Sequence, residues 1–534
     1  MLKHISLAVI SGLFLALAWP TYGLCPLIFI AFVPLLWADY QLREQYSKNN
    51  FRAFLLAFIA FVIWNGISTW WIWNATPAGG VFAIIVNTLL MTLVFMLYHW
   101  IAKRRPLRFS LIAFSGLWIG FEKFHHHWDF SWPWLTLGNV FSERITWIQW
   151  YEYTGIFGGS LWVLLINAMV FTALVTYLQS GNRKYFIKQL IAAASLVAIG
   201  ILISQYIYLT YDNKGETIEA IALQPNTNPY TEKYNRSHTE IANELIRLAL
   251  PDMSPNTAVV LAPETVFSTK VTTEEFENSQ TYGMLNQFID RYPNTDLLMG
   301  IDLYKIYSDD IPRSKTANSF SNTASAWYES YNGAFFLSRN NPVEYYHKSK
   351  LVVGVELFPY RRFFKPLLGN VMIDLGGTVS TLTPQKEPSV FTLSKSDVKI
   401  APVICYESIY GEFMGKYTKK GAEIFGIVTN DSWWGRTQGY QQLLSYARLR
   451  AIEHRRSIVR SANSGVSAFI NQKGEVISRL DYEIQGALKG QLQVNKKLTL
   501  YSRQGDFVAR IMAFVGILFA LAAFFVPRKK AGEE

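Results

Sequence analysis

The chain has 534 residues, of which 50% are hydrophobic and only 17% are charged. Soluble globular proteins carry about 25% charged residues, so a large part of this chain does not face water. Two cysteines in this length exclude a disulfide-stapled scaffold, and the hydrophobic content excludes intrinsic disorder.

Eight apolar stretches are long enough, some with their flanks, to cross a bilayer, which takes about 20 helical residues. The first could instead be a signal peptide, but no A-x-A-like cleavage site follows it and Trp19-Pro20 leads directly into the next apolar stretch. We therefore expect eight transmembrane helices, near residues 3–19, 23–40, 53–73, 80–101, 109–122, 155–178, 188–209 and 508–527.

Basic residues are concentrated in alternate loops between these stretches, and the longer opposite loop 123–154 holds only Lys123 and Arg144. If Lys3 is cytoplasmic, fourteen basic residues fall on the cytoplasmic side, whereas the opposite short loops 19–23 and 74–79 hold none. This positive-inside pattern predicts cytoplasmic termini and places the domain at 211–507 on the outer side of the membrane. The fourteen are Lys3, Arg43, Lys48, Arg52, Lys103, Arg104, Arg105, Arg108, Arg183, Lys184, Lys188, Arg528, Lys529 and Lys530.

The same loops account for nearly all of the net charge of +11. The charge therefore suits anionic lipid headgroups and argues against a nucleic-acid partner. Three adjacent histidines, His125 to His127, could suggest a metal site. Adjacent side chains do not share one helical or strand face, and no further ligands stand nearby, so we expect no metal.

From residue 216 onward, short β-branched segments alternate with helical ones, which predicts a layered α/β domain. We expect a transmembrane domain at 1–210, an α/β domain at 211–507, and a last helix with a basic tail at 508–534. Helices are expected near 231–249, 274–291, 408–419 and 437–454, and a hairpin over 323–338 that turns at Tyr331-Asn332-Gly333. Expected strands are Ile218–Leu223, Ala258–Ala262, Leu297–Ile301, Ala324–Tyr328, Gly333–Leu337, Lys399–Ile404, Ile424–Val428, Ser457–Arg460 and Ser467–Ile470.

Polar residues follow several of these strands. Glu264 follows the second, Cys405-Tyr406-Glu407 the sixth, and Thr429-Asn430-Asp431 the seventh. Active sites of α/β sheets gather beyond the carboxyl ends of strands. We therefore expect one converging site.

A cysteine, a glutamate and a lysine of this domain suit acyl transfer. A thiolate of Cys405 would be the nucleophile, Glu264 a general base, and Lys348 or Lys350 the cation that stabilises an oxyanion. Each also has an ordinary interpretation, namely a buried packing cysteine, a solvent-facing strand-end carboxylate or a surface lysine. The combination is more informative than any single residue.

The order glutamate, lysine, cysteine along an α/β domain resembles that of the nitrilase superfamily. The flanking membrane segments narrow the resemblance to the apolipoprotein N-acyltransferase family. The resemblance spans nearly the whole chain. Lys350 departs from the family's usual His, Val353-Gly354-Val355 from Pro-Phe-Gly, and Tyr234 from Trp. The matching segments are Trp132-Pro133-Trp134-Leu135-Thr136-Leu137-Gly138, Ala262-Pro263-Glu264-Thr265, Lys348-Ser349-Lys350-Leu351-Val352 with Glu356, Ile404-Cys405-Tyr406-Glu407-Ser408, Thr429-Asn430-Asp431-Ser432-Trp433-Trp434-Gly435, 447–453 and 460–465.

The resemblance implies a nitrilase-like αββα sandwich between the seventh and eighth transmembrane helices of a bacterial inner-membrane protein. It implies transfer of an acyl chain from a phospholipid, through a Cys405 thioester, to the α-amino group of a diacylglyceryl-apolipoprotein. Glu264 and Lys348 complete the catalytic set, and neither cofactor nor metal is implied. Supporting or substrate-binding residues are Glu356, Tyr406, Glu407, Tyr234, Trp433 and Trp434.

Two alternatives stay open. A membrane-tethered nitrilase-type amidase would hydrolyse a small amide with the same residues, although a tether needs only one span. A transporter would place charges within its spans, and these spans hold almost none. A stretch of aromatic and basic residues at 357–368 is expected to contact membrane lipid.

Overall fold

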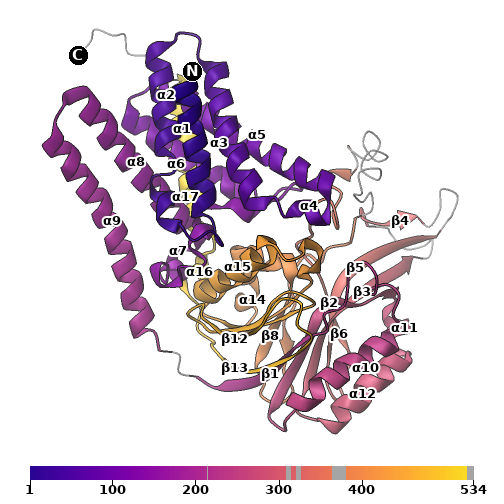
Figure 1. Cartoon of the computed structure of the whole chain (residues 1–534). Helices are drawn as coiled ribbons and strands as arrows, with labels where there is room; N and C mark the ends of the chain where they lie inside the picture. The colour runs from indigo at the N-terminus through magenta and orange to yellow at the C-terminus, as the bar shows by residue number, and fades with distance from the viewer. Residues whose placement is uncertain (213–214, 308–313, 320–325, 362, 364–380, 526–534) are drawn as a thin grey trace. The chain divides into compact units, whose positions relative to one another are not determined.

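A computed structural model gives the structure of residues 1–212, 215–307, 314–319, 326–361, 363 and 381–525 (Figure 1). The chain divides into two compact units, described separately below. The helical unit comprises Met1–Trp73, Pro77–Thr210 and Gln504–Glu534, and the α/β unit comprises Asn74–Thr76 and Tyr211–Arg503.

Six helical segments of the described residues are long and apolar enough to cross a membrane. Two other expected spans form shorter or more charged helices: α1 (Leu2–Ala18) has 17 residues, and α6 (Leu107–Phe124) carries Arg108, Glu122 and Lys123. The basic tail at 528–530 lies outside the described residues. The six are η1 (Cys25–Phe29) with α2 (Val33–Gln45), α3 (Asn50–Thr69), α5 (Pro77–Ala102), α8 (Ile156–Ser180), α9 (Arg183–Thr210) and α17 (Phe507–Phe525).

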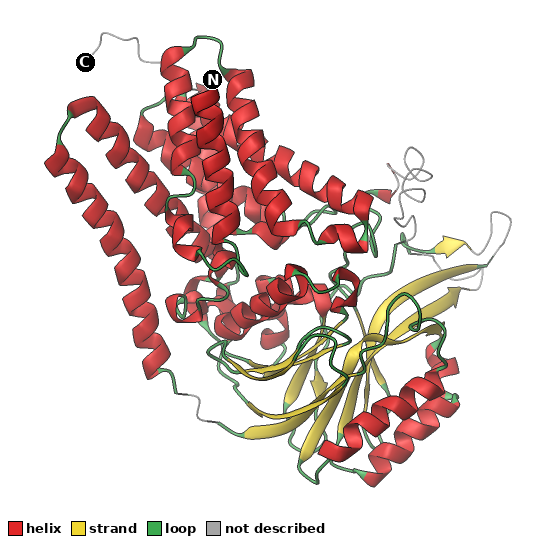
Figure 2. Cartoon of the chain, viewed as in Figure 1, coloured by secondary structure: helices red, strands yellow, loops and turns green. Residues whose placement is uncertain are grey.

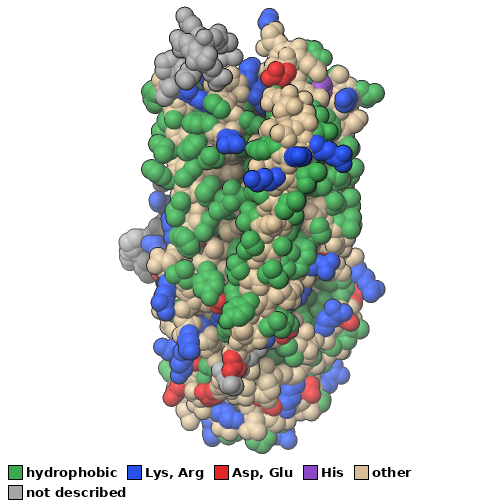
Figure 3. All heavy atoms as spheres, turned by 90° about the vertical axis from the view of Figure 1, so that its left-hand side faces the viewer, with side chains coloured by type: hydrophobic (Ala, Val, Ile, Leu, Met, Phe, Trp, Pro, Cys, Tyr) green, Lys and Arg blue, Asp and Glu red, His purple; other side chains and the backbone are tan. Residues whose placement is uncertain are grey.

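The surface of the helical unit is apolar. Of the 28 residues of α9, only Ala193 and Ser204 are buried, and large side chains such as Leu202 and Leu209 are exposed. Hydrophobic side chains cover much of this face in Figure 3. An apolar surface of this extent suits the interior of a bilayer. No water is available there, so a helix is stable because it satisfies its backbone hydrogen bonds internally.

The α/β unit contains two sheets. The strand order of the first is β13-β1-β2-β3-β5-β4, with β6 also paired to β5, and that of the second is β12-β11-β10-β9-β8-β7. The pairs β1–β2, β2–β3, β8–β9 and β9–β10 are parallel. The strands are β1 (Thr217–Gln224), β2 (Thr257–Val271), β3 (Asp296–Tyr307), β4 (Asn318–Ser319), β5 (Trp327–Leu337), β6 (Glu344–His347), β7 (Phe391–Thr392), β8 (Lys399–Ile404), β9 (Ile424–Thr429), β10 (Ser457–Ala462), β11 (Ser467–Ile470), β12 (Val476–Leu480) and β13 (Gly486–Gln493).

Helices cover the outer face of each sheet, giving a helix–sheet–sheet–helix order (Figure 2). Helices α10 (His238–Ala249) and α12 (Gln280–Arg291) pack apolar residues such as Leu245 and Leu285 on the first sheet. Helices α14 (Gly411–Lys419) and α15 (Gln438–His454) lie on the side of the second. The expected layered α/β domain is therefore present, and its parallel strands direct their carboxyl ends to a common region.

Several predicted boundaries are wrong. No hairpin turns at 331–333, because β5 runs unbroken from Trp327 to Leu337 and pairs with β3 throughout, with Asn332 opposite Asp302. The helix expected at 231–249 begins only at His238, where Ser237 and Glu240 form a capping box. The helix expected at 274–291 is two, α11 (Thr273–Glu277) and α12. Residues 324–325 and most of 362–368 lie outside the described residues.

Candidate active site

Glu264 lies inside strand β2, at a break in its pairing with β3. The register is regular up to Ala262 and resumes only at Phe267. Thr265, the next residue, has a φ of +46°, which side chains rarely adopt. Gly300 on β3 makes this possible, because a Cβ there would lie 2.3 Å from the Pro263 carbonyl oxygen and 2.7 Å from the Glu264 Cα. The break turns Glu264 out of the ladder and toward the second sheet.

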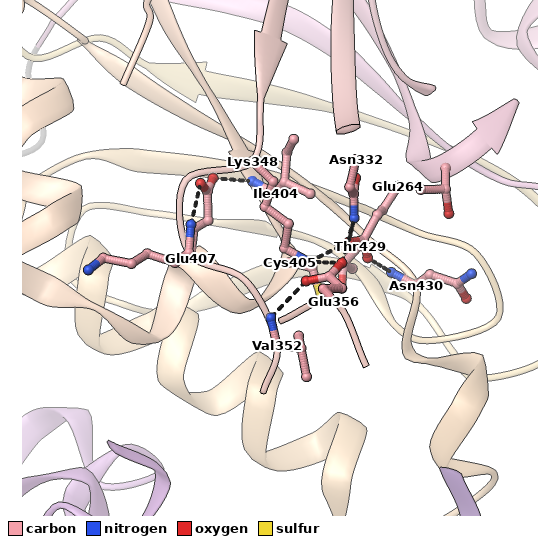
Figure 4. Close-up of polar contacts among 12 residues, drawn as sticks. Glu264, Asn332, Lys348, Val352, Glu356, Ile404, Cys405, Glu407, Thr429 and Asn430 are labelled. Carbon is pink, nitrogen blue, oxygen red and sulfur yellow. Dashed lines mark hydrogen bonds and ion pairs between the residues drawn. The ribbon is translucent and has the colours of Figure 1, made fainter. Parts of the chain in front are cut away.

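The Lys348 ammonium bridges two carboxylates. Its Nζ lies 2.8 Å from Glu264 Oε1 and 2.9 Å from Glu356 Oε1, and the lysine is buried (Figure 4). Lys348 follows β6, and its backbone N–H donates to the Asn332 carbonyl at 2.8 Å. Glu356 Oε2 accepts from the Val352 N–H at 2.8 Å. The register fixed by these bonds makes Lys348, not Lys350, the neighbour of Glu264.

Asn332 joins the same arrangement. Its Nδ2 donates to Glu264 Oε1 at 2.7 Å and to Glu356 Oε1 at 2.8 Å. Each of these two oxygens therefore accepts from both the ammonium and the amide. The remaining oxygen of Glu264, Oε2, accepts from the Asn430 N–H at the end of β9, at 3.1 Å. The carboxylate is thus held from β5, β6 and β9 together.

Cys405 lies at the junction of β8 and the short helix η6 (Cys405–Ile409). Its φ is +48°, a strained backbone conformation typical of sharp turns at functional sites. The thiol is buried and in hydrogen-bond contact with Thr429 at the end of β9. The Thr429 hydroxyl in turn donates to Asp431 Oδ1 at 2.7 Å. Figure 4 shows Cys405 beside Glu264, Lys348 and Glu356.

Glu407 fixes the segments that carry the lysine and the cysteine. Its Oε1 accepts from the Ser349 N–H at 2.6 Å, and its Oε2 accepts from the Ile404 N–H at 2.8 Å. The Tyr346 hydroxyl also donates to Oε1, at 2.5 Å. Ser349 follows Lys348 and Ile404 precedes Cys405, so this one buried carboxylate ties both residues to a single position. Burial raises the pKa of Glu407 to about 7.

The charges of the site favour a protonated thiol beside an ionised carboxylate. Burial, and then the charge of Glu264, raises the pKa of Cys405, although Lys348 opposes this. Burial alone would also raise the pKa of Glu264, but the Lys348 ammonium and the Asn332 amide hold it below its usual value. Burial would lower the pKa of Lys348, but Glu264 and Glu356 hold it well above its usual value. The proton therefore rests on sulfur until a substrate arrives.

Comparisons with known proteins bear on both halves of the chain. Residues 11–169 match the family model of the apolipoprotein N-acyltransferase N-terminal domain, and residues 317–496 match that of carbon-nitrogen hydrolases. An apolipoprotein N-acyltransferase of Chlorobaculum tepidum is 27% identical, covering 98% of this chain and 97% of its own. One of Geobacter metallireducens is 24% identical, covering 97% and 94%. Over nearly its whole length, this chain is therefore similar to apolipoprotein N-acyltransferases.

Solved structures are similar to part of this chain. An amidase of the nitrilase superfamily from Nesterenkonia AN1 is 12% identical, with a TM-score of 0.36, and covers 56% of this chain and 95% of its own. A carbon-nitrogen hydrolase from Helicobacter pylori G27 is 15% identical, with a TM-score of 0.33.

The remaining residues predicted for the site fall in different places. Tyr406 is buried, with its ring 5.4 Å from that of Tyr410. Tyr234 is 61% exposed. Trp433 is half-buried with its ring 5.4 Å from that of Tyr230, whereas Trp434 packs on the cluster formed by Tyr440, Val466 and Tyr482. The structure thus places Trp434 against this cluster.

Two residues of the site escaped prediction. The Asn332-Gly333 pair predicts a turn, and only the β3–β5 pairing places Asn332 inside a strand. Lys233 precedes Tyr234 in a segment predicted to be helical, but it lies before α10 begins and is buried. No group of three or more potential ligands that could hold a metal occurs among the described residues, and His125 Nδ1 instead accepts from Trp128 Nε1 at 3.2 Å.

Proposed function

We propose that this protein transfers an acyl chain from a membrane phospholipid to the α-amino group of the N-terminal diacylglyceryl-cysteine of an apolipoprotein. The observation that carries the proposal is the Lys348–Glu264 ion pair beside the buried thiol of Cys405, in a chain of the N-acyltransferase family. Catalytic residues are Glu264, Lys348 and Cys405. Glu356, Tyr406 and Glu407 support them, and Tyr234, Trp433 and Trp434 belong to the surrounding substrate region.

In the first stage, Cys405 attacks the carbonyl carbon of a phospholipid ester, and its proton passes to Glu264. The low pKa of the carboxylate and the high pKa of the thiol oppose early proton transfer, so the proton moves as the S–C bond forms. Lys348 stabilises the oxyanion, a contribution worth about 3–4 kcal/mol for one donor. Collapse breaks the C–O bond, and the lysophospholipid leaves with the proton from Glu264.

In the second stage, the free α-amine attacks the thioester carbon and gives its proton to Glu264. The C–S bond then breaks, an amide is released, and the proton on Glu264 returns to Cys405. Splitting the transfer into two acyl steps through a thiol is the usual advantage of covalent catalysis. Each step uses the same oxyanion position, so one cation serves both.

The membrane arrangement follows from lipid substrates. The six apolar helices and the family support a multi-pass protein of the bacterial inner membrane. We propose eight spans in all, with α1 and α6 as the two further ones and the α/β unit between the seventh and eighth. The distribution of basic residues supports cytoplasmic termini and a periplasmic α/β unit.

Mass spectrometry of the full-length protein in phospholipid vesicles tests this function. A palmitoyl-sized adduct on Cys405, sensitive to hydroxylamine and absent from Cys405→Ala, is the expected first-stage product. Addition of a synthetic diacylglyceryl-lipopeptide should discharge it and yield an N-acylated peptide. A protein that never gains the adduct, or that releases only free fatty acid when the lipopeptide is present, would be a hydrolase of the amidase kind.

A further inference from the structure

Lys233 carries a buried ammonium close to the candidate active site. The residue is 7% exposed, and its Nζ donates to Thr265 Oγ1 at 2.5 Å. Among the described residues no carboxylate oxygen lies within 4.0 Å of this ammonium. Buried lysines are rare unless they are paired, because removing the charge from water is costly. The ammonium therefore has donors that the protein itself does not use.

Two aromatic rings also lie close to this ammonium. Nζ lies 5.6 Å from the ring centroid of Tyr234 and 5.5 Å from that of Trp433. Ring faces stabilise a cation through their quadrupoles but accept no full hydrogen bond. They leave Lys233 charged and able to donate. The two rings are also the residues that family resemblance places around the substrate.

The position of Lys233 is fixed by strand β2. Its carbonyl accepts from Ser268 Oγ at 2.5 Å, while its ammonium reaches Thr265, the residue directly after Glu264. Both ends of the lysine are therefore tied to the strand that carries the proposed base. Such a fixed cation suits recognition of one defined group of the substrate.

The carboxyl groups near Lys233 are either bound by other donors or only partly ionised. Glu264 and Glu356 are bound by Lys348 and Asn332. Burial raises the pKa of Asp302 to about 7, so near neutral pH this carboxyl is only partly ionised. Burial lowers the pKa of Lys233, and the charges of Asp302, Glu264 and Glu356 oppose that effect. Among the described residues, the donors of Lys233 are therefore not committed to a carboxylate.

We propose that Lys233 binds the phosphodiester of the phospholipid acyl donor, with the rings of Tyr234 and Trp433 beside it. The inference rests on the proposed function and adds how the donor is recognised. The phosphodiester and the ester share one glycerol, so a donor whose ester lies at Cys405 must hold its phosphate nearby. A lysine is a suitable point charge for phosphate. The acceptor's diacylglyceryl-cysteine has no such group.

The test isolates the first stage by omitting the acceptor. The rate of acylation of Cys405 is measured with dipalmitoyl phosphatidylglycerol and with p-nitrophenyl palmitate, an ester without phosphate. Lys233→Gln should slow acylation by the phospholipid about 10- to 100-fold, as expected for a lost hydrogen bond to a charged group. Acylation by the nitrophenyl ester, which has no phosphate, should slow far less. Lys233→Arg should retain most of the phospholipid rate, and the exposed Lys395→Gln should behave as wild type.

Each other outcome has a definite meaning. Equal slowing with both esters would assign Lys233 to the chemistry at Cys405 and overturn the proposal, and so would no slowing with either. If the variants do not fold, a comparison of two lipids with the wild-type protein tests the inference instead. Phosphatidylglycerol should acylate Cys405 at least about tenfold faster than dipalmitoylglycerol does. Equal rates from those two lipids would overturn the inference. Absence of any adduct from phospholipid in the wild type would instead overturn the proposed function.

Discussion

Asn332 and Lys348 donate to the same two carboxylate oxygens. Glu264 Oε1 accepts at 2.7 Å from the amide and 2.8 Å from the ammonium, and Glu356 Oε1 accepts at 2.8 and 2.9 Å. The amide of Asn332 therefore donates to the same two oxygens as the lysine but carries no charge. Two carboxylates can stay this close only because four donors lie between them.

Asn332→Ala should reduce acyl transfer about 10- to 100-fold, because hydrogen bonds to charged groups contribute about 1.5–3 kcal/mol. The amide also helps to lower the pKa of Glu264. Its removal raises that pKa, so the acid limb of the pH–rate profile should move to higher pH. The exposed Asn278→Ala is the control. An unchanged limb, with or without loss of rate, would leave Asn332 with a packing role only.

Gly300→Ala should abolish most activity while the protein still folds. Its Cβ would lie 2.4 Å from the Thr265 backbone nitrogen and 2.7 Å from the Glu264 Cα, so the carboxylate must shift. A displacement of about 1 Å at a catalytic group costs about 100-fold in rate. Gly283→Ala in α12, where no heavy atom lies within 4 Å of the added Cβ, is the matched control. Kinetics and thermal unfolding of both variants check this, and normal turnover of Gly300→Ala would be inconsistent with a tightly packed Glu264.

Lys348→Met should lose both activity and stability. Breaking a buried ion pair by removing one partner costs about 3–5 kcal/mol, because the remaining charges are uncompensated. The double variant Lys348→Met/Glu356→Gln removes one of the two carboxylates and should recover part of the unfolding free energy without recovering acyl transfer. Denaturant unfolding and adduct formation separate the two effects. Recovery of activity in the double variant would show that Lys348 only balances charge.

The pH dependence of the first stage should change in Asp302→Asn. The pKa of Asp302 is about 7, raised by burial and lowered by Lys233 and Lys270, with Glu264 and Glu356 raising it further. Above that pH the carboxylate ionises, competes for Lys233 and repels a phosphodiester. Between about pH 6 and pH 8, acylation by phosphatidylglycerol in the wild type should therefore fall relative to Asp302→Asn. The nitrophenyl ester should give parallel profiles, and a difference with that ester would place the effect of Asp302 on the chemistry instead.

Some features followed from the sequence because they are local. Apolar length predicted the membrane helices, with six of the expected eight meeting the length and composition needed to span. Alternating strand and helix patterns predicted the α/β unit. Short segments around Glu264, Lys348 and Cys405 pointed to the family through residue identity alone.

Other features required partners far apart in the chain. An Asn-Gly pair reads as a turn, but pairing of β5 with β3 over its full length keeps Asn332 inside a strand and directs it to Glu264, 68 residues away. Lys233 lies in a segment predicted only to be helical, whereas the tertiary structure buries its ammonium beside Thr265 and two aromatic rings. The sequence by itself determined which elements form and which chemistry is available, since periodicity and residue type are local properties. Only the tertiary structure decided which charges meet, because that depends on the register of strands that are distant in the chain.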